Sequence, residues 1–80
     1  MGISVLKLDS DAVDVETTDC ALRVVLADGR ELLAPLEWFP RLRDATPGQR
    51  SNWRLIGGGQ GIHWPEIDED IAVATLLRSS

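Results

Sequence analysis

Apolar and polar positions alternate with a period of two along much of the first third of the chain. Residues 12–17 and residues 21–26 have this pattern, which is typical of a half-buried strand. The apolar residues expected to face the core are Val13, Val15, Leu22, Val24 and Leu26. The acids expected to face solvent are Asp14 and Glu16. Residues 3–8 are apolar at mixed spacing, and we expect a first strand there or an arm packed on the core.

The dipeptide Asp28-Gly29 predicts a hairpin between two of these strands. A two-residue turn would pair Leu26 with Glu31 and Val24 with Leu33. A three-residue turn with a bulge pairs Leu22 with Ala34 and leaves Glu31 outside. Because a buried apolar face determines the register of a strand, we predict the bulged form.

Prolines divide the middle of the chain. Pro35 should end the strand, since it has no N–H to donate. A turn over residues 36–39 followed by a helix that begins at Pro40 avoids a proline within a helix. Thr46 followed by Pro47 is typical of a capping residue and the first turn of a second short helix.

Residues 53–71 hold the most distinctive pattern. Strand-forming residues precede the glycine-rich segment 57–61, which permits a tight reversal. Ile62 and Trp64 then recur at strand spacing, so we expect a hairpin that buries Trp53 and Trp64 in one core. A phosphate-binding loop would need Lys and then Ser or Thr after the glycines, so a ligand site at these glycines is the least favoured hypothesis.

The acids of 68–70 precede an apolar segment, 71–77. Acids suit the N-terminus of a helix, so we predict a short C-terminal helix that packs on the sheet. The residues expected at that contact are Ile71 or Val73, with Leu76 and Leu77. These elements predict an α+β fold, with a small antiparallel β-sheet of about 4–5 strands and one or two short helices packed on it. Residues 1–80 are expected to form a single compact domain.

Thirteen acids against eight bases give a net charge of −5. This charge disfavours direct nucleic-acid binding, which would need a basic stripe. The chain has one cysteine, Cys20, so it cannot form a disulfide within itself. No apolar run approaches the roughly 20 residues of a membrane span, so we expect a cytoplasmic protein without membrane attachment.

The acids gather in two stretches, one before residue 20 and the other over 66–70. We predict that they form a surface for a basic partner. The predicted partner-binding residues are Asp9, Asp11, Asp14, Glu16, Asp19, Glu66, Asp68, Glu69 and Asp70. A solvated face that keeps a small protein soluble is the alternative interpretation.

Few residues are available for catalysis. His63 and Cys20 are the only His and Cys, whereas a zinc site needs about four nitrogen or sulfur ligands. Neither residue has a partner that would activate it as part of a nucleophilic pair. We therefore expect no metal, no cofactor and no enzymatic activity.

Several segments resemble a family of short bacterial proteins of unknown function. The matching segments are residues 26–30, 35–42, 45–47, 52–59 and 61–71. The resemblance implies a compact, cytosolic, β-rich α+β domain without assigned catalytic residues. Some members of that family carry a helix-turn-helix or are encoded beside toxin–antitoxin-like genes. This sequence has no helix-turn-helix, so the resemblance does not imply direct DNA binding.

These observations lead to two main hypotheses of function. In the first, the chain is a non-enzymatic acidic protein that binds and inhibits a basic, nucleic-acid-handling complex, with carboxylates in place of phosphates. Its size and charge are similar to those of small acidic phage anti-CRISPR proteins. In the alternative, it is an antitoxin-like or regulatory partner with Trp38 and Phe39 as anchors, unless both lie in the core. A monomer is expected, and a homodimer through strand edges is the other arrangement.

Overall fold

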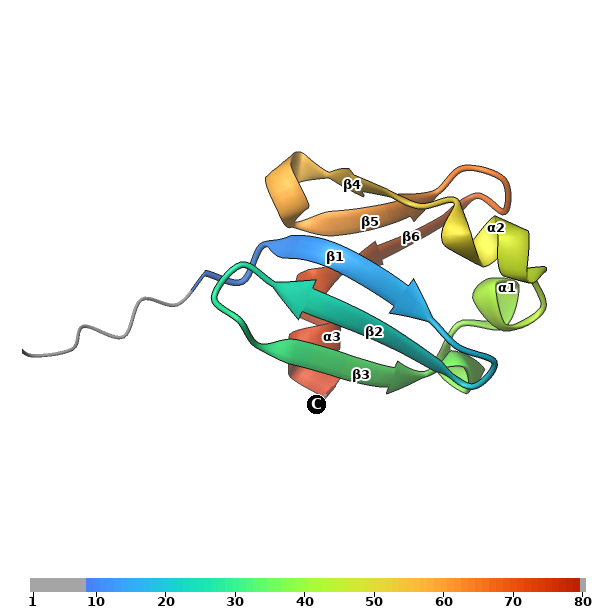
Figure 1. Ribbon diagram of the computed structural model, residues 1–80, viewed down its shortest axis with the longest axis horizontal. Helices are drawn as coiled ribbons and strands as arrows, with labels where there is room; N and C mark the ends of the chain where they lie inside the picture. The colour runs from blue at the N-terminus through green and yellow to red at the C-terminus, as the bar shows by residue number, and fades with distance from the viewer. Residues whose placement is uncertain (1–8, 80) are drawn as a thin grey trace, which may run out of the picture.

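Two three-stranded antiparallel sheets form the framework of the computed structural model, which describes residues 9–79 (Figure 1). The first sheet has the order β1-β2-β3 and the second the order β4-β5-β6. The strands are β1 (Ala12–Thr17), β2 (Ala21–Leu26), β3 (Glu31–Pro35), β4 (Arg54–Ile56), β5 (Gly61–Trp64) and β6 (Glu69–Ala72). The helical segments are η1 (Leu36–Trp38), α1 (Pro40–Arg43), α2 (Pro47–Ser51), η2 (Gly57–Gly59) and α3 (Val73–Ser79).

The α+β class is confirmed, but the expected arrangement of its strands is corrected. The described residues form six strands in two sheets, rather than 4–5 strands in one. Between β3 and β4 the chain passes through η1, α1 and α2, and β4, β5 and β6 form the second sheet. The predicted strand or arm at residues 3–8 lies outside the described residues.

The register predicted for the β2–β3 hairpin is confirmed. Leu22 pairs with Ala34, as the bulged turn requires. The amide of Leu26 donates to the carbonyl of Arg30 at 2.8 Å, and Gly29 adopts a φ of 93°. Glycine tolerates this left-handed conformation without steric cost, which explains why the hairpin turns there.

The orientation predicted for Val13 is wrong. The pairing of β1 with β2 shifts between Ala12 and Asp14, so one extra residue is inserted in β1. Such a bulge breaks the strict alternation of faces. Ala12 and Val15 therefore face the core, while Val13 is 52% exposed.

The connection from the first sheet to the second follows the predicted punctuation. α1 begins at Pro40, and Thr46 caps α2. The hydroxyl of Thr46 accepts a hydrogen bond from the amide of Gln49 at 3.1 Å, while the Gln49 side chain accepts from the amide of Thr46 at 3.0 Å. This reciprocal capping box satisfies two amides at the start of the helix.

The predicted central hairpin is also present, with β4 paired to β5. All three glycines of η2 have positive φ. Gly59 is buried against β1, where an added Cβ would lie 2.7 Å from the carbonyl oxygen of Ala12. The glycine-rich segment therefore brings the second sheet against the first by close backbone contact.

The acids of 68–70 do not begin a helix, which corrects that prediction. Residues 65–68 form a turn, Glu69 and Asp70 belong to β6, and α3 begins at Val73. Ile71 pairs with Ile62 of β5. Pairing along β5 favours the extended conformation over the helix that the acids alone would suit.

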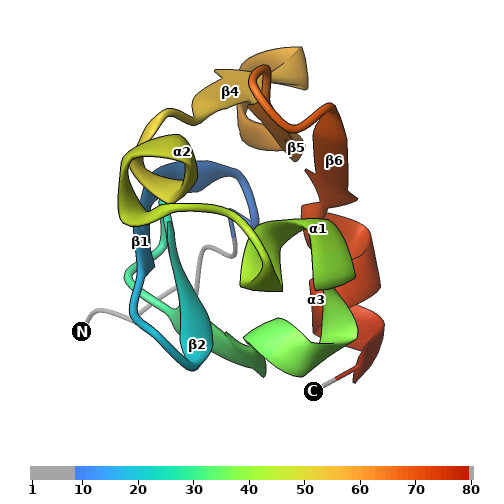
Figure 2. The same ribbon diagram turned by 90° about the vertical axis from the view of Figure 1, so that its right-hand side faces the viewer.

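One hydrophobic core lies between the sheets and α3. Figure 2 shows the two sheets on different sides of this core, with α3 completing the enclosure. The largest fully buried side chains are Trp64, Leu22, Leu26, Leu36, Leu42, Ile62 and Val24. The outward faces of the two sheets consequently point in different directions.

Candidate functional site

The exposed face of the first sheet brings acidic and apolar side chains together. We call it the outer face, and it comprises Val13, Asp14, Glu16, Arg23, Val25, Glu31 and Leu33. Its rows follow from the register. Asp14, Val25 and Glu31 lie side by side across the three strands, and Glu16, Arg23 and Leu33 form the next row.

Arg23 is the only base on the outer face and contacts two of its carboxylates. The guanidinium donates to Glu31 at 2.7 Å and lies 3.6 Å from Glu16. The hydrogen bond from Arg23 lowers the pKa of Glu31, and the same bond raises the pKa of Arg23. The carboxylate of Asp14 makes no salt bridge within residues 9–79, although its charge is among those that raise the pKa of Arg23. The face therefore keeps an excess of negative charge.

Two aliphatic side chains are exposed beside these carboxylates. Leu33 is 67% exposed on β3, and Val13 is 52% exposed on β1. Sequence reasoning did not single out Leu33, Arg23 or Glu31 as site residues. The predicted hairpin register could have identified Leu33 as an exposed residue. It turns Leu32 and Ala34 inward, and successive side chains of a strand point to opposite faces.

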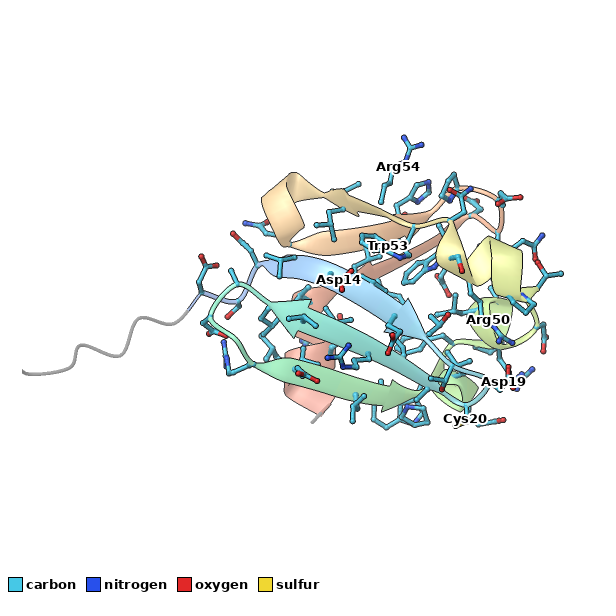
Figure 3. All side chains as sticks on the ribbon, in the orientation of Figure 1. Asp14, Asp19, Cys20, Arg50, Trp53 and Arg54 are labelled. Atoms are coloured by element: carbon cyan, nitrogen blue, oxygen red, sulfur yellow. The ribbon has the colours of Figure 1, made fainter. Side chains whose placement is uncertain are left out.

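The acids at the ends of β1 are separated along the strand. Asp9 and Asp11 precede it, and the side chain of Asp9 accepts a hydrogen bond from the amide of Asp11 at 3.1 Å. Asp19 lies in the turn after β1, at the opposite end of the sheet (Figure 3), 3.6 Å from the guanidinium of Arg50. Of the predicted β1 acids, only Asp14 and Glu16 belong to the outer face.

The second predicted acidic stretch lies on the hairpin of the other sheet. Glu66 accepts a hydrogen bond from Asn52 at 2.8 Å, and Asp70 contacts Nδ1 of His63 at 2.5 Å. Asp68 occupies the turn with a φ of 51°. This stretch belongs to the hairpin of β5 and β6, whereas Asp14 and Glu16 lie on the sheet of β1, β2 and β3.

The aromatic residues have different environments. Trp64 is fully buried, and Trp53 and Phe39 pack against the core while remaining partly exposed. Trp38 is 51% exposed. The anchor pair considered from the sequence is therefore divided, because Phe39 contributes to the core and Trp38 is available to solvent.

The candidate catalytic residues lie on different sheets. His63 is on β5 of the second sheet beside Asp70, whereas Cys20 lies in the exposed turn between β1 and β2. Within residues 9–79, no group of three or more His, Cys, Asp or Glu side chains is arranged to hold a metal ion. None of the helices in the same part of the chain has the length and apolarity needed to cross a membrane.

The fold and the outer face define a small α+β protein with an acidic and apolar surface on one sheet. The chain belongs to the family described as "Protein of unknown function (DUF2442)", whose family model matches residues 12–80. The resemblance to a family of unknown function noted in the sequence is thereby confirmed. Neither the characterised proteins nor the solved structures include a match to the chain.

Proposed function

We propose that this chain is a non-enzymatic interaction protein that binds a basic protein through the outer face. The observation that carries the proposal is the set of three carboxylates, on Asp14, Glu16 and Glu31, around one guanidinium and two exposed aliphatic side chains. Carboxylates bind Lys and Arg by charge-assisted hydrogen bonds. Exposed Leu33 and Val13 would add apolar contact within the same area.

The class of partner follows from the charge. A basic site that handles nucleic acid is suited to carboxylates, which would stand where phosphate groups normally bind. The chain would then act as an inhibitor of a nucleic-acid-handling complex, in the manner of a phage anti-defence protein. The expected compartment is the bacterial cytoplasm, as the single cysteine suggests.

An antitoxin-like role is the second candidate, and one observation favours it. Trp38 and Leu33 are both more than half exposed, and exposed aromatic residues are common anchors in protein interfaces. In this role the chain would neutralise a small bacterial protein mainly by apolar contact. Such a complex would respond weakly to salt, whereas binding by the carboxylates would weaken as salt screens the charges.

The first experiment is capture of partners from a bacterial lysate by the tagged chain, followed by mass spectrometry. The acidic proposal predicts a basic nucleic-acid-binding complex that is released by added DNA or by ~0.5 M salt. Binding that does not change at that salt concentration contradicts the acidic proposal. Capture of a small protein that salt does not release supports the antitoxin-like role.

Charge-matched variants test which surface binds the captured partner. The double variant D14K/E16K reverses two charges on the outer face, and E66K/E69K reverses two on the second sheet. We expect loss of the partner in the first and retention in the second. R23Q should have the opposite effect and strengthen binding, because it frees Glu16 and Glu31 from their internal partner. Equal losses in both double variants would exclude the outer face as the specific site.

A further inference from the structure

The free edge of β3 is regular along its length. β3 is the last strand in the order β1-β2-β3, and its pairing with β2 has no register shift. The opposite edge strand, β1, contains the bulge at Val13 and is covered in part by Gly59. Bulges and covering segments are common protections of sheet edges. Within residues 9–79, β3 has no bulge. The helix α3 contacts β3 and places Val73 and Leu76 in the core.

The direction of the backbone groups on β3 follows from the ladder. The amide of Leu26 donates to the carbonyl of Arg30, and the amide of Leu36 donates to the carbonyl of Cys20. Hydrogen-bonded pairs recur at every second residue between these two ends, so they include Leu22 with Ala34. In an antiparallel pair these positions alternate with non-hydrogen-bonded positions. The N–H and C=O groups of Leu33 therefore point away from β2. Glu31 shares this orientation, and Pro35 presents only a carbonyl to the same edge.

We propose that this edge pairs with β3 of a second copy of the chain, antiparallel and with a two-fold axis at Leu33. In this register each Leu33 amide donates to the Leu33 carbonyl of the other copy. Each Glu31 amide donates to the carbonyl of Pro35 in the other copy. The three-stranded sheets then continue across the axis as one sheet.

Side-chain complementarity selects this register. Glu31 lies opposite a proline, so no two carboxylates are directly opposed across the strands. The two Leu33 side chains, each 67% exposed in the monomer, contact one another on the outer face. A shift of the axis toward Glu31 would bring the two Glu31 carboxylates together, and like charges at directly opposed positions are destabilising.

The pairing of two copies does not depend on the proposed binding of a basic partner. Two features distinguish the two kinds of association. Each copy carries a charge of −5, so salt should strengthen self-association by screening repulsion. Salt should weaken the complex with a basic partner. The pairing also needs only the purified chain and can be tested without knowing that partner.

Sedimentation equilibrium of the full chain tests the pairing. Between ~10 µM and ~1 mM protein, the apparent mass should rise from 8.8 kDa toward twice that value. The variant L33P removes the outward N–H without removing a ladder bond, since proline is tolerated at an edge when its N–H would face solvent. We expect L33P to remain monomeric with an unchanged circular dichroism spectrum. A wild-type chain that stays at 8.8 kDa at the highest concentration and at high salt would overturn the proposal.

Charge variants provide a second test that does not depend on how L33P folds. L33R and L33E each place like charges across the axis, so each should associate at least ~10-fold more weakly than the wild type. An equimolar mixture of the two should recover the dimer. V13R is the matched control at the other edge of the outer face and should dimerise as the wild type does. Failure of the mixture to associate, or equal weakening by V13R, would place the axis elsewhere and refute the proposal.

Discussion

The indole Nε1 of Trp64 donates a hydrogen bond of 3.0 Å to the backbone carbonyl oxygen of Arg50. Trp64 lies on β5, and Arg50 is in α2. The guanidinium of the same Arg50 donates to the carbonyls of Leu42 at 3.0 Å and Arg43 at 2.9 Å. One residue thus joins the second sheet to both short helices, which are too short to be stable without tertiary contacts.

Replacement of Trp64 by Phe should destabilise the fold. The change leaves a cavity and removes the donor to Arg50, and we expect a loss of about 3 kcal/mol. Urea unfolding followed by circular dichroism measures it. W38F is the control, because Trp38 is half exposed and its loss should stay within about 0.5 kcal/mol. Similar losses in the two variants would contradict the structural role of the Trp64 hydrogen bond and burial.

Replacement of Arg50 by Lys should also destabilise the fold, by about 1–2 kcal/mol. A lysine ammonium cannot reproduce the planar set of donors that reaches two carbonyls at once. The Arg50 side chain is only 11% exposed, so water replaces the lost bonds poorly. R54K is the control, because Arg54 points into solvent at the edge of β4 (Figure 3). We expect the same unfolding midpoint for R54K as for the wild type.

Gly59 should tolerate substitution less well than its neighbour Gly58. We expect G58A to lower the free energy of unfolding by about 1–2 kcal/mol, because alanine must adopt a left-handed conformation there. The space around the added methyl is open. In G59A the added methyl also meets the Ala12 carbonyl oxygen at 2.7 Å, so we expect a loss of about 3 kcal/mol or more. Thermal unfolding of both variants gives the comparison. Equal midpoints would mean that η2 does not pack tightly against β1.

Asp28 should contribute stability that depends on pH. Its carboxylate accepts from the side chain of Arg30 at 2.9 Å and from the amides of Asp9 and Arg30. The hydrogen bond from the Arg30 side chain is the largest cause that lowers the pKa of Asp28 from 3.8 to about 2. Because the pKa is lower in the folded state, the contribution is complete above pH ~4 and is lost as the pH falls through about 2.

The variant D28N tests this dependence. At neutral pH it should unfold at a lower temperature than the wild type, and the difference should narrow as the pH falls below 3.8 toward 2. Thermal unfolding at a series of pH values measures the difference. If the difference in unfolding temperature between D28N and the wild type stays constant over this range, the charge of Asp28 is not the source of the lost stability.

Local signals in the sequence predicted several elements correctly. The bulged turn at Gly29, the helix start at Pro40 and the cap at Thr46 were all predictable. Each depends on residues that are close in sequence, through a positive φ, a missing N–H or a short side chain that reaches a nearby amide. The inward orientation of Ile62 and Trp64 followed in the same way from strand periodicity.

Tertiary structure decided the features that depend on distant partners. Residues 69–72 became a strand because β5 was available to pair with them, although their acids also suit a helix. Val13 turned outward because β1 contains a bulge against β2. The two acidic stretches were placed on different sheets around one core, because β1 pairs with β2 whereas β6 pairs with β5. Sequence by itself therefore determined the local geometry of the turns and caps and the acidic character of the chain. Pairing and burial determined which acids share a surface, since both depend on contacts between residues far apart in the sequence.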